Sequence, residues 1–219
     1  MSDHIAIAID GPAASGKSST AKAVARALGY RHVDSGSLYR AATASRARRG
    51  GDAKSWTEQS VLEAAREVTL QPVEHGFIPL IDGESAESEM RGEIVTGSVS
   101  LVARMPHVRD WVNAQVRRAA ESSDVVVDGR DIGTVVFPNA QLKVFLVAAP
   151  EERARRRLRE TFHREPTADE IIAETATIQR RDMMDAAQSA MAEDAVRIDT
   201  TKMTQEEQTE RIVQLVKGV

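Results

Sequence analysis

Eight residues near the start of the chain have the composition and spacing of a phosphate-binding loop. They run from Gly11 to Ser18 with the sequence GPAASGKS and fit G-x-x-x-x-G-K-[ST] at every fixed position. Glycines let successive N–H groups converge on phosphate oxygens, and a helix starting here adds partial positive charge. Lys17 would reach the β- and γ-phosphates, and the Ser18 hydroxyl would ligate Mg²⁺. We therefore predict a nucleoside-triphosphate site made by Gly11, Pro12, Ala13, Ala14, Ser15, Gly16, Lys17, Ser18 and Ser19.

Two aspartates are alternatives for a further group near the cation. Asp128 directly follows three valines, as a Walker-B aspartate does, whereas Asp10 directly precedes the glycine-rich loop and could accept a hydrogen bond from a group that binds the cation. The metal ligand that the motif itself assigns is Ser18. The five histidines show no metal-ligand spacing, so we expect them at surface or core positions.

Composition and charge exclude several classes of protein. The 219 residues carry 29 basic and 33 acidic side chains, a net charge of −4, so no global basic surface predicts a nucleic-acid partner. The absence of cysteine excludes disulfides, thiolate metal sites and cysteine nucleophiles. The first apolar run is too short for a secretion signal, and no later run approaches a membrane span of ~18 residues. We expect a cytoplasmic protein without a membrane partner.

The apolar pattern predicts an α/β fold. Strands without a polar face are typical of a buried parallel sheet, and they alternate here with helical patterns such as 17–28 and 106–119. The strands are expected at 5–9, 30–33, 125–127, 143–147 and 196–198. Between 68 and 89, His75-Gly76 and Asp82-Gly83 predict hairpins and hence a small β-containing insertion.

Capping boxes mark where three further helices should begin. In this motif a Ser or Thr side chain and a residue three positions later satisfy each other's backbone N–H groups. The pairs are Ser55 with Glu58, Thr167 with Glu170, and Thr204 with Glu207.

Five segments in order resemble bacterial cytidylate kinases, which are nucleoside monophosphate kinases. The segments are GPAASGKSS near the start, DSGSLYR at 34–40, VSLVARMPHVR at 99–109, DGRDIGTVVFPNA at 128–140 and RRDMMD at 180–185. The resemblance implies a P-loop NTPase-type parallel five-stranded sheet flanked by helices, a monophosphate-binding insertion and a mobile lid. The boundaries that we expect are 1–60 for the core with the loop, 61–100 for the insertion, 101–150 for core, 151–170 for the lid and 171–219 for the C-terminal core.

The reaction implied by the resemblance transfers the γ-phosphoryl group of ATP to the α-phosphate of CMP or dCMP. A nucleotide phosphate has a second pKa near ~6, so it is already a dianion at neutral pH. It needs no general base, but it does need alignment and relief of repulsion between two polyanions. The expected cofactors are ATP and Mg²⁺, and we expect a monomer.

The resemblance also assigns residues to the acceptor site. Arg40 and Arg130 match positions that hold the acceptor phosphate, with Ser35 nearby; Ser100, Arg109 and Asp131 match base contacts, and Arg181 and Asp185 match the ribose side. Cytosine presents an N4 donor and an N3 acceptor, which uracil reverses, so an acceptor such as Asp131 with a donor such as Arg109 fits cytosine. An i, i+4 surface ion pair is the structural alternative for Arg181 and Asp185. Gln188 replaces an arginine that is usual in the family, which leaves nucleoside binding there open.

Arginines are also concentrated where the lid should begin. Arg153, Arg156 and Arg157 share one face of a helix, while Arg155 and Arg159 point elsewhere. We expect the first face to meet ATP, with Arg153 and Arg157 joining Lys17 and Arg130 as catalytic residues. A solvated helix or an RNA-binding patch is the alternative. The alternative functions are a P-loop kinase for UMP, AMP or another metabolite, and a P-loop NTPase switch or nucleic-acid module.

Overall fold

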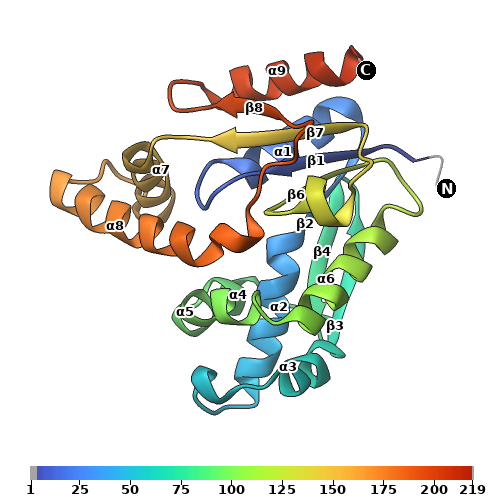
Figure 1. Cartoon of the computed structure of the whole chain (residues 1–219). Helices are drawn as coiled ribbons and strands as arrows, with labels where there is room; N and C mark the ends of the chain where they lie inside the picture. Colours follow the sequence, from blue (N-terminus) through green and yellow to red (C-terminus); the bar gives the residue numbers. More distant parts are fainter. Residues whose placement is uncertain (1–3, 219) are drawn as a thin grey trace.

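The computed structural model describes residues 4–218, except the side chain of Ala187, and a single sheet runs through it (Figure 1). Its strands are β1 (Ala6–Asp10), β2 (Arg31–Asp34), β3 (Val68–Val73), β4 (Gly76–Ile81), β5 (Glu84–Ser85), β6 (Val125–Gly129), β7 (Leu142–Val147) and β8 (Val196–Asp199). The order is β3-β4-β2-β6-β1-β7-β8, and β5 pairs with β4. Neighbours from β2 to β8 are parallel, which confirms the predicted five-stranded parallel sheet.

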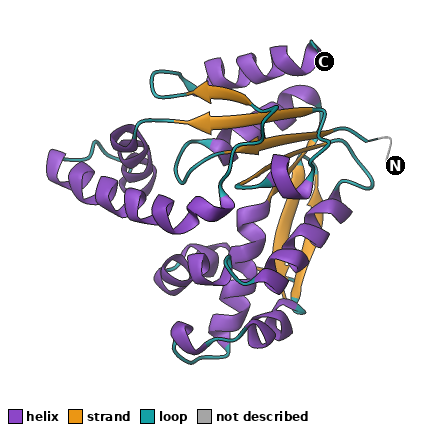
Figure 2. Cartoon of the chain, in the orientation of Figure 1, coloured by secondary structure: helices purple, strands orange, loops and turns teal. Residues whose placement is uncertain are grey.

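Helices cover both faces of this sheet (Figure 2). They are α1 (Lys17–Leu28), α2 (Ser35–Arg48), α3 (Glu58–Ala65), α4 (Glu87–Arg91), α5 (Glu93–Val102), α6 (Pro106–Ala119), α7 (Pro150–Phe162), α8 (Ala168–Asp185) and α9 (Gln205–Lys217), with short turns η1 (Ala53–Ser55), η2 (Ile132–Val136) and η3 (Ala186–Gln188). Alternation along β1 explains the two layers, because successive side chains point to opposite faces. Ile7 and Ile9 pack with α1 and α9, whereas Ala6 and Ala8 pack with α2 and α6. None of the helices within residues 4–218 is long and apolar enough to cross a membrane.

The predicted hairpins form an extension at one edge of the sheet. β3 and β4 pair antiparallel over the turn at 74–75, and β4 and β5 pair over Asp82-Gly83. A single residue pair, Gly76 with His32, joins β4 to the parallel strand β2. A Cβ on Gly76 would lie 2.6 Å from the His32 carbonyl oxygen, so this contact requires glycine.

Side-chain caps mark where α3, α8 and α9 begin. Thr167 with Glu170 and Thr204 with Glu207 form the predicted boxes at the starts of α8 and α9. The prediction for Ser55 with Glu58 is wrong. Thr57 caps α3 together with Ser60, because the Glu58 carboxylate accepts instead from the backbone N–H of His107 and pairs with its ring. The Ser55 hydroxyl donates to the Asp52 carbonyl within η1.

Candidate active site

The glycine-rich loop joins β1 to α1 at the carboxyl edge of the sheet. Gly11 approaches the neighbouring strand β7 so closely that a Cβ would lie 2.2 Å from the Leu146 carbonyl oxygen. Gly16 is left-handed and Lys17 begins α1, so the positive end of this helix faces the loop. The Lys17 ammonium folds back to donate to the Pro12 carbonyl at 2.9 Å. This is the backbone arrangement that the motif predicts for binding phosphates.

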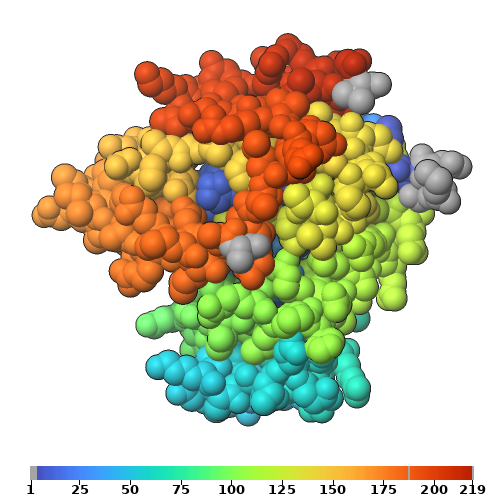
Figure 3. Space-filling model, viewed as in Figure 1, coloured from blue at the N-terminus to red at the C-terminus, as the bar shows by residue number. Residues whose placement is uncertain are grey.

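A cavity of about 240 Å³ opens from this loop toward α5 and α6. Figure 3 shows blue atoms of the N-terminal part at the bottom of a hollow that is bordered by gold and orange atoms, the colours of the segment that contains α7 and α8. Besides Lys17 and Ser18, the cavity is lined by all eight residues predicted for the acceptor: Ser35, Arg40, Ser100, Arg109, Arg130, Asp131, Arg181 and Asp185. Gln188 also lines it. Residues from seven elements and loops, far apart in the sequence, therefore meet in one space next to the phosphate-binding loop.

Oxygen-bearing side chains converge at the start of α1. The Ser18 hydroxyl donates to an Asp128 carboxylate oxygen at 2.6 Å and lies 3.5 Å from a carboxylate oxygen of Asp34. Burial, and next the charge of Asp128, raise the pKa of Asp34, so the two carboxylates repel each other here. Hard oxygen ligands with excess negative charge suit Mg²⁺. Of the two alternatives from the sequence, Asp128 contacts Ser18, whereas Asp10 accepts hydrogen bonds from the backbone elsewhere.

Basic groups in the cavity have lowered pKa values because they are withdrawn from water and crowd one another. Burial, followed by the charge of Arg130, lowers the pKa of Lys17 to about 7. Burial and then the charge of Arg130 likewise lower the pKa of Arg181 to about 10. Burial also lowers the pKa of Arg130 itself and of Arg40. An anion placed among these groups would relieve the repulsion, as expected of a phosphate site.

Three of the arginines are held by aspartates. Arg130 pairs with Asp185 at 2.8 Å and donates to the Gly11 carbonyl at 3.2 Å. Arg181 lies 3.7 Å from the same carboxylate. The Arg181–Asp185 ion pair, which the sequence offered as a structural alternative, therefore forms, but it is the longer of the two contacts that Asp185 makes. Arg109 pairs with Asp131 and also donates to the Ala103 carbonyl at 3.0 Å. Donor and acceptor groups are thus presented side by side at the α6 end of the cavity.

Three arginines of α7 bind different parts of the molecule, namely the phosphate-binding loop, helix α8 and the segment after β8. The buried Arg153 donates to the Ala13 carbonyl at 2.9 Å and pairs with Asp182 of α8 at 2.7 Å, so it holds the phosphate-binding loop. Arg156 donates to the Thr200 carbonyl at 2.5 Å. Arg157 pairs with Glu174 of α8 at 3.2 Å, and its charge acts on Arg40 and Arg181 across the cavity.

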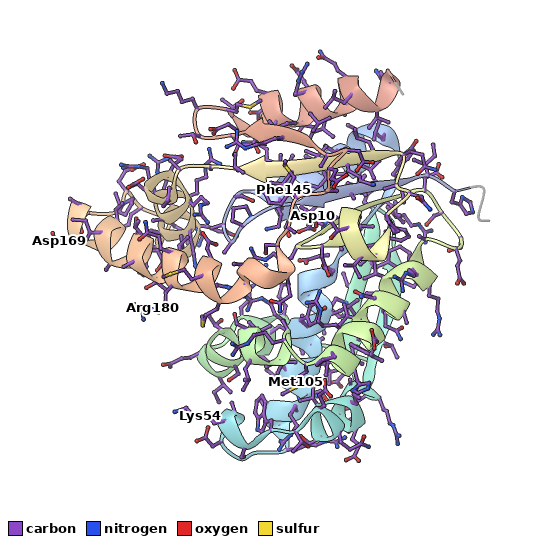
Figure 4. The ribbon with its side chains drawn as sticks, viewed as in Figure 1. Asp10, Lys54, Met105, Phe145, Asp169 and Arg180 are labelled. Atoms are coloured by element: carbon purple, nitrogen blue, oxygen red, sulfur yellow. The ribbon has the colours of Figure 1, made fainter. Side chains whose placement is uncertain are left out.

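The other two arginines of α7 pair with nearby glutamates. Arg155 lies 3.8 Å from Glu152, and Arg159 pairs with Glu165 at 2.9 Å. On α8, Figure 4 shows Arg180 on the outer side of the helix, whereas its neighbour Arg181 lines the cavity.

Comparison with known proteins identifies the family. The sequence model of the cytidylate kinase family matches residues 7–218. The chain belongs to the cytidylate kinase family. A cytidylate kinase from Geobacillus kaustophilus is 46% identical over 223 residues, covering 99% of this chain and 98% of that protein. One from Caldanaerobacter subterraneus is 39% identical, covering 97% and 95%. A solved structure of an uncharacterized protein from Eubacterium ventriosum has a TM-score of 0.53 at 11% identity, covering 99% of this chain and 100% of that one, and shows the fold alone.

The site of this cytidylate kinase family member also contains residues to which the sequence analysis assigned no role. Asp34 caps α2 through the N–H of Ser37, yet its other oxygen faces Ser18. Tyr39 lines the cavity with a hydroxyl that has no hydrogen-bond partner among the described residues, and burial raises its pKa to about 12. His32 lies 2.7 Å from the Asp128 carboxylate. Asp34 and Tyr39 belong to the segment DSGSLYR, which was the available signal for both.

Proposed function

We propose that this protein transfers the γ-phosphoryl group of ATP to CMP or dCMP, giving ADP and CDP or dCDP. The observation that carries the proposal is the single cavity that joins the phosphate-binding loop to a cluster of arginines and to the Arg109–Asp131 pair. Membership of the cytidylate kinase family supports the same substrates.

The chemistry of the acceptor explains why arginines dominate this site. The phosphate of CMP is a dianion at neutral pH, so proton abstraction is not required. Arg40 and Arg130 bind that phosphate in the proposal, and Lys17 stabilises the charge that develops on the transferred group. Arg153 and Arg157 approach the transferred group from α7. Together these cations align two anions that would otherwise repel each other.

The residues at the start of α1 fit a magnesium ion. Ser18 would ligate it, with Asp128 and Asp34 as neighbouring carboxylates. When bound with ATP, Mg²⁺ would neutralise part of the triphosphate charge.

The acceptor base is selected by the donor and acceptor groups of α6 and the segment after β6. Asp131 accepts from the N4 amino group of cytosine, and Arg109 donates to N3. Uracil would place a carbonyl against the carboxylate and an N–H against the guanidinium group, which leaves both unpaired. Ser100 completes the base side, and Arg181 and Asp185 bind near the ribose.

The remaining parts of the proposal concern motion and assembly. We propose segment 61–100 as the monophosphate-binding insertion, because Arg40 donates to the Met90 carbonyl within it at 3.0 Å. Segment 151–170 is proposed as the lid, although a boundary at 170 falls within α8 (Ala168–Asp185). We also propose that the protein is a cytoplasmic monomer. Light scattering after size-exclusion chromatography measures its molar mass in solution and so tests the monomeric state.

An assay of nucleotide products tests the function. Purified protein is incubated with ATP and Mg²⁺, alone and with CMP, dCMP, UMP or AMP, and products are separated by ion-exchange chromatography. We expect CDP and dCDP with equimolar ADP, and little ADP without an acceptor. A P-loop NTPase would instead release phosphate at the same rate in every arm. A kinase for another acceptor would phosphorylate UMP or AMP in preference to CMP.

A further inference from the structure

Asp10 is a buried carboxylate that is not part of the proposed substrate contacts. It is the last residue of β1, its side chain is nearly inaccessible, and Figure 4 shows it beside the turn η2. One carboxylate oxygen accepts from the backbone N–H of Ile132 at 2.9 Å, and the other accepts from the N–H of Gly133 at 2.8 Å. Both oxygens of this carboxylate are therefore used to bind two consecutive amides of another segment.

Those two amides directly follow the residues proposed to bind the acceptor. Arg130 and Asp131 directly follow β6, which ends at Gly129, and η2 begins at the next residue, Ile132. Asp131 itself has an irregular backbone, with φ −139° and ψ 28°, so no strand or helix ladder fixes its direction. The carbonyl of Asp131 accepts from the N–H of Val135 at 2.8 Å, which ties its conformation to the turn that Asp10 holds.

Asp10 also sits at the other substrate's binding loop. The next residue, Gly11, begins the glycine-rich loop, and its carbonyl accepts from the Arg130 guanidinium at 3.2 Å. Three hydrogen bonds therefore join residues 10–11 to residues 130–133. Two of them come from one side chain, and that side chain has no alternative partner among the contacts described for residues 4–218.

We propose that Asp10 is a positioning residue that sets the orientation of the base-reading Asp131, and so contributes to the choice of cytosine over uracil, by binding the amides of Ile132 and Gly133. The inference rests on the proposed function, because it concerns how one part of that site is held. Asp10 itself contacts neither nucleotide. Its effect passes through the backbone of 131–133.

Replacing Asp10 with asparagine changes this contact with little change in volume. An amide offers one acceptor oxygen, and its NH₂ group faces the N–H of the second amide as donor against donor. A buried N–H left without an acceptor is unfavourable, so the turn will shift to find one. A displacement of about 1 Å in a residue that aligns substrate can cost about 100-fold in rate.

The test compares Asp10→Asn with a matched control, Asp124→Asn. Asp124 likewise uses a carboxylate to accept a backbone N–H, that of Ile5 at 2.7 Å, but it does so at the opposite end of β1. For wild type and both variants, kcat/KM is measured with CMP and with UMP at saturating ATP, and KM is measured for ATP. Hydrogen exchange followed by NMR reports protection of the Ile132 and Gly133 amides, independently of activity.

We expect Asp10→Asn to lower the CMP-to-UMP ratio of kcat/KM by about tenfold or more, with KM for ATP changed by less than about twofold. Protection of at least one of the two amides should fall in this variant, while Asp124→Asn should keep the wild-type ratio and protection.

Several outcomes overturn the inference. An unchanged CMP-to-UMP ratio in Asp10→Asn, or an equal fall with both acceptors, shows that Asp10 has no role in base selection. If that variant does not fold, hydrogen exchange in the wild-type protein still tests whether the contact exists. The inference is refuted if the Ile132 and Gly133 amides exchange as fast as those of an exposed loop. A wild-type protein that makes no CDP, but whose two amides are protected, contradicts the proposed function rather than the contact of Asp10.

Discussion

Proton uptake during triphosphate binding tests the role of Lys17 directly. The pKa of Lys17 is lowered to about 7, by burial first and then by the charge of Arg130. Phosphate oxygens placed against the amine favour its charged form, so binding raises this pKa and draws a proton from the buffer. At pH 8, a lysine with a pKa near 7 is about one-tenth protonated, so we expect uptake of about 0.9 proton per triphosphate bound.

Isothermal titration calorimetry measures this number. The Mg²⁺ complex of the non-hydrolysable analogue AMP-PNP is titrated at pH 8 in buffers that differ in ionisation enthalpy, and the slope of observed enthalpy against that quantity counts the protons. At pH 8 Asp10, with a pKa raised by burial to about 6, is already ionised and adds nothing.

Two variants complete the experiment. Lys17→Met should bind the analogue more weakly and abolish the uptake. Lys22→Met, which removes an exposed amine from the same helix, should leave the proton uptake unchanged. A wild-type slope near zero, or the same slope in Lys17→Met, would refute the reasoning that Lys17 gains its charge from the ligand.

Three further measurements address other parts of the molecule. Asp131→Asn should reduce the CMP-over-UMP preference at least about tenfold, because an amide beside Arg109 can also donate to uracil O4; an unchanged ratio of kcat/KM would show that Asp131 does not read the base. Burial alone would lower the pKa of His32, but its hydrogen bond to Asp128 and the nearby carboxylates raise it overall. This pairing stabilises the protein fully below about pH 6.5 and less as pH rises through the folded-state pKa, so His32→Gln should cost more stability in urea unfolding at pH 6 than at pH 9. Thr167→Ala should lower the free energy of unfolding by about 1 kcal/mol through loss of the α8 cap, and a melting temperature within about 1 °C of wild type would contradict that role.

Local sequence signals were enough to predict most of the fold. Apolar runs identified β1, β6 and β7, and short segments with only two apolar residues at 30–33 and 196–198 identified β2 and β8. The boxes at Thr167 and Thr204 located the starts of α8 and α9. The box expected at Ser55 failed because Glu58 has a competing partner, His107, that lies 49 positions away in the sequence. Local pattern carries no information about such a partner.

In the candidate site too, the sequence predicted which residues line the cavity but not how they pair with one another. The residues predicted for the acceptor all line one cavity. For those that follow β2 and β6 the sequence explains why, because strand ends meet at one edge of a parallel sheet, whereas the others lie on α5, α6 and α8. The motifs did not predict that Asp185 pairs more closely with Arg130 than with Arg181, or that Arg153 binds the Ala13 carbonyl. Those contacts depend on how α7 and α8 pack against the loop, which side-chain spacing within either helix does not determine.

The single pairing of Gly76 with His32 has a consequence for how this chain tolerates change. Because a single residue pair links β4 to β2, an insertion at the outer turns of this extension leaves the register of the parallel strands unchanged, provided that Val68 and Ile81 stay packed in the core. The exposed turn at Asp82-Gly83, between β4 and β5, is the place in this extension for a fluorescent label or an affinity tag. Gly76 itself is the exception, since any larger residue there would push against the neighbouring main chain.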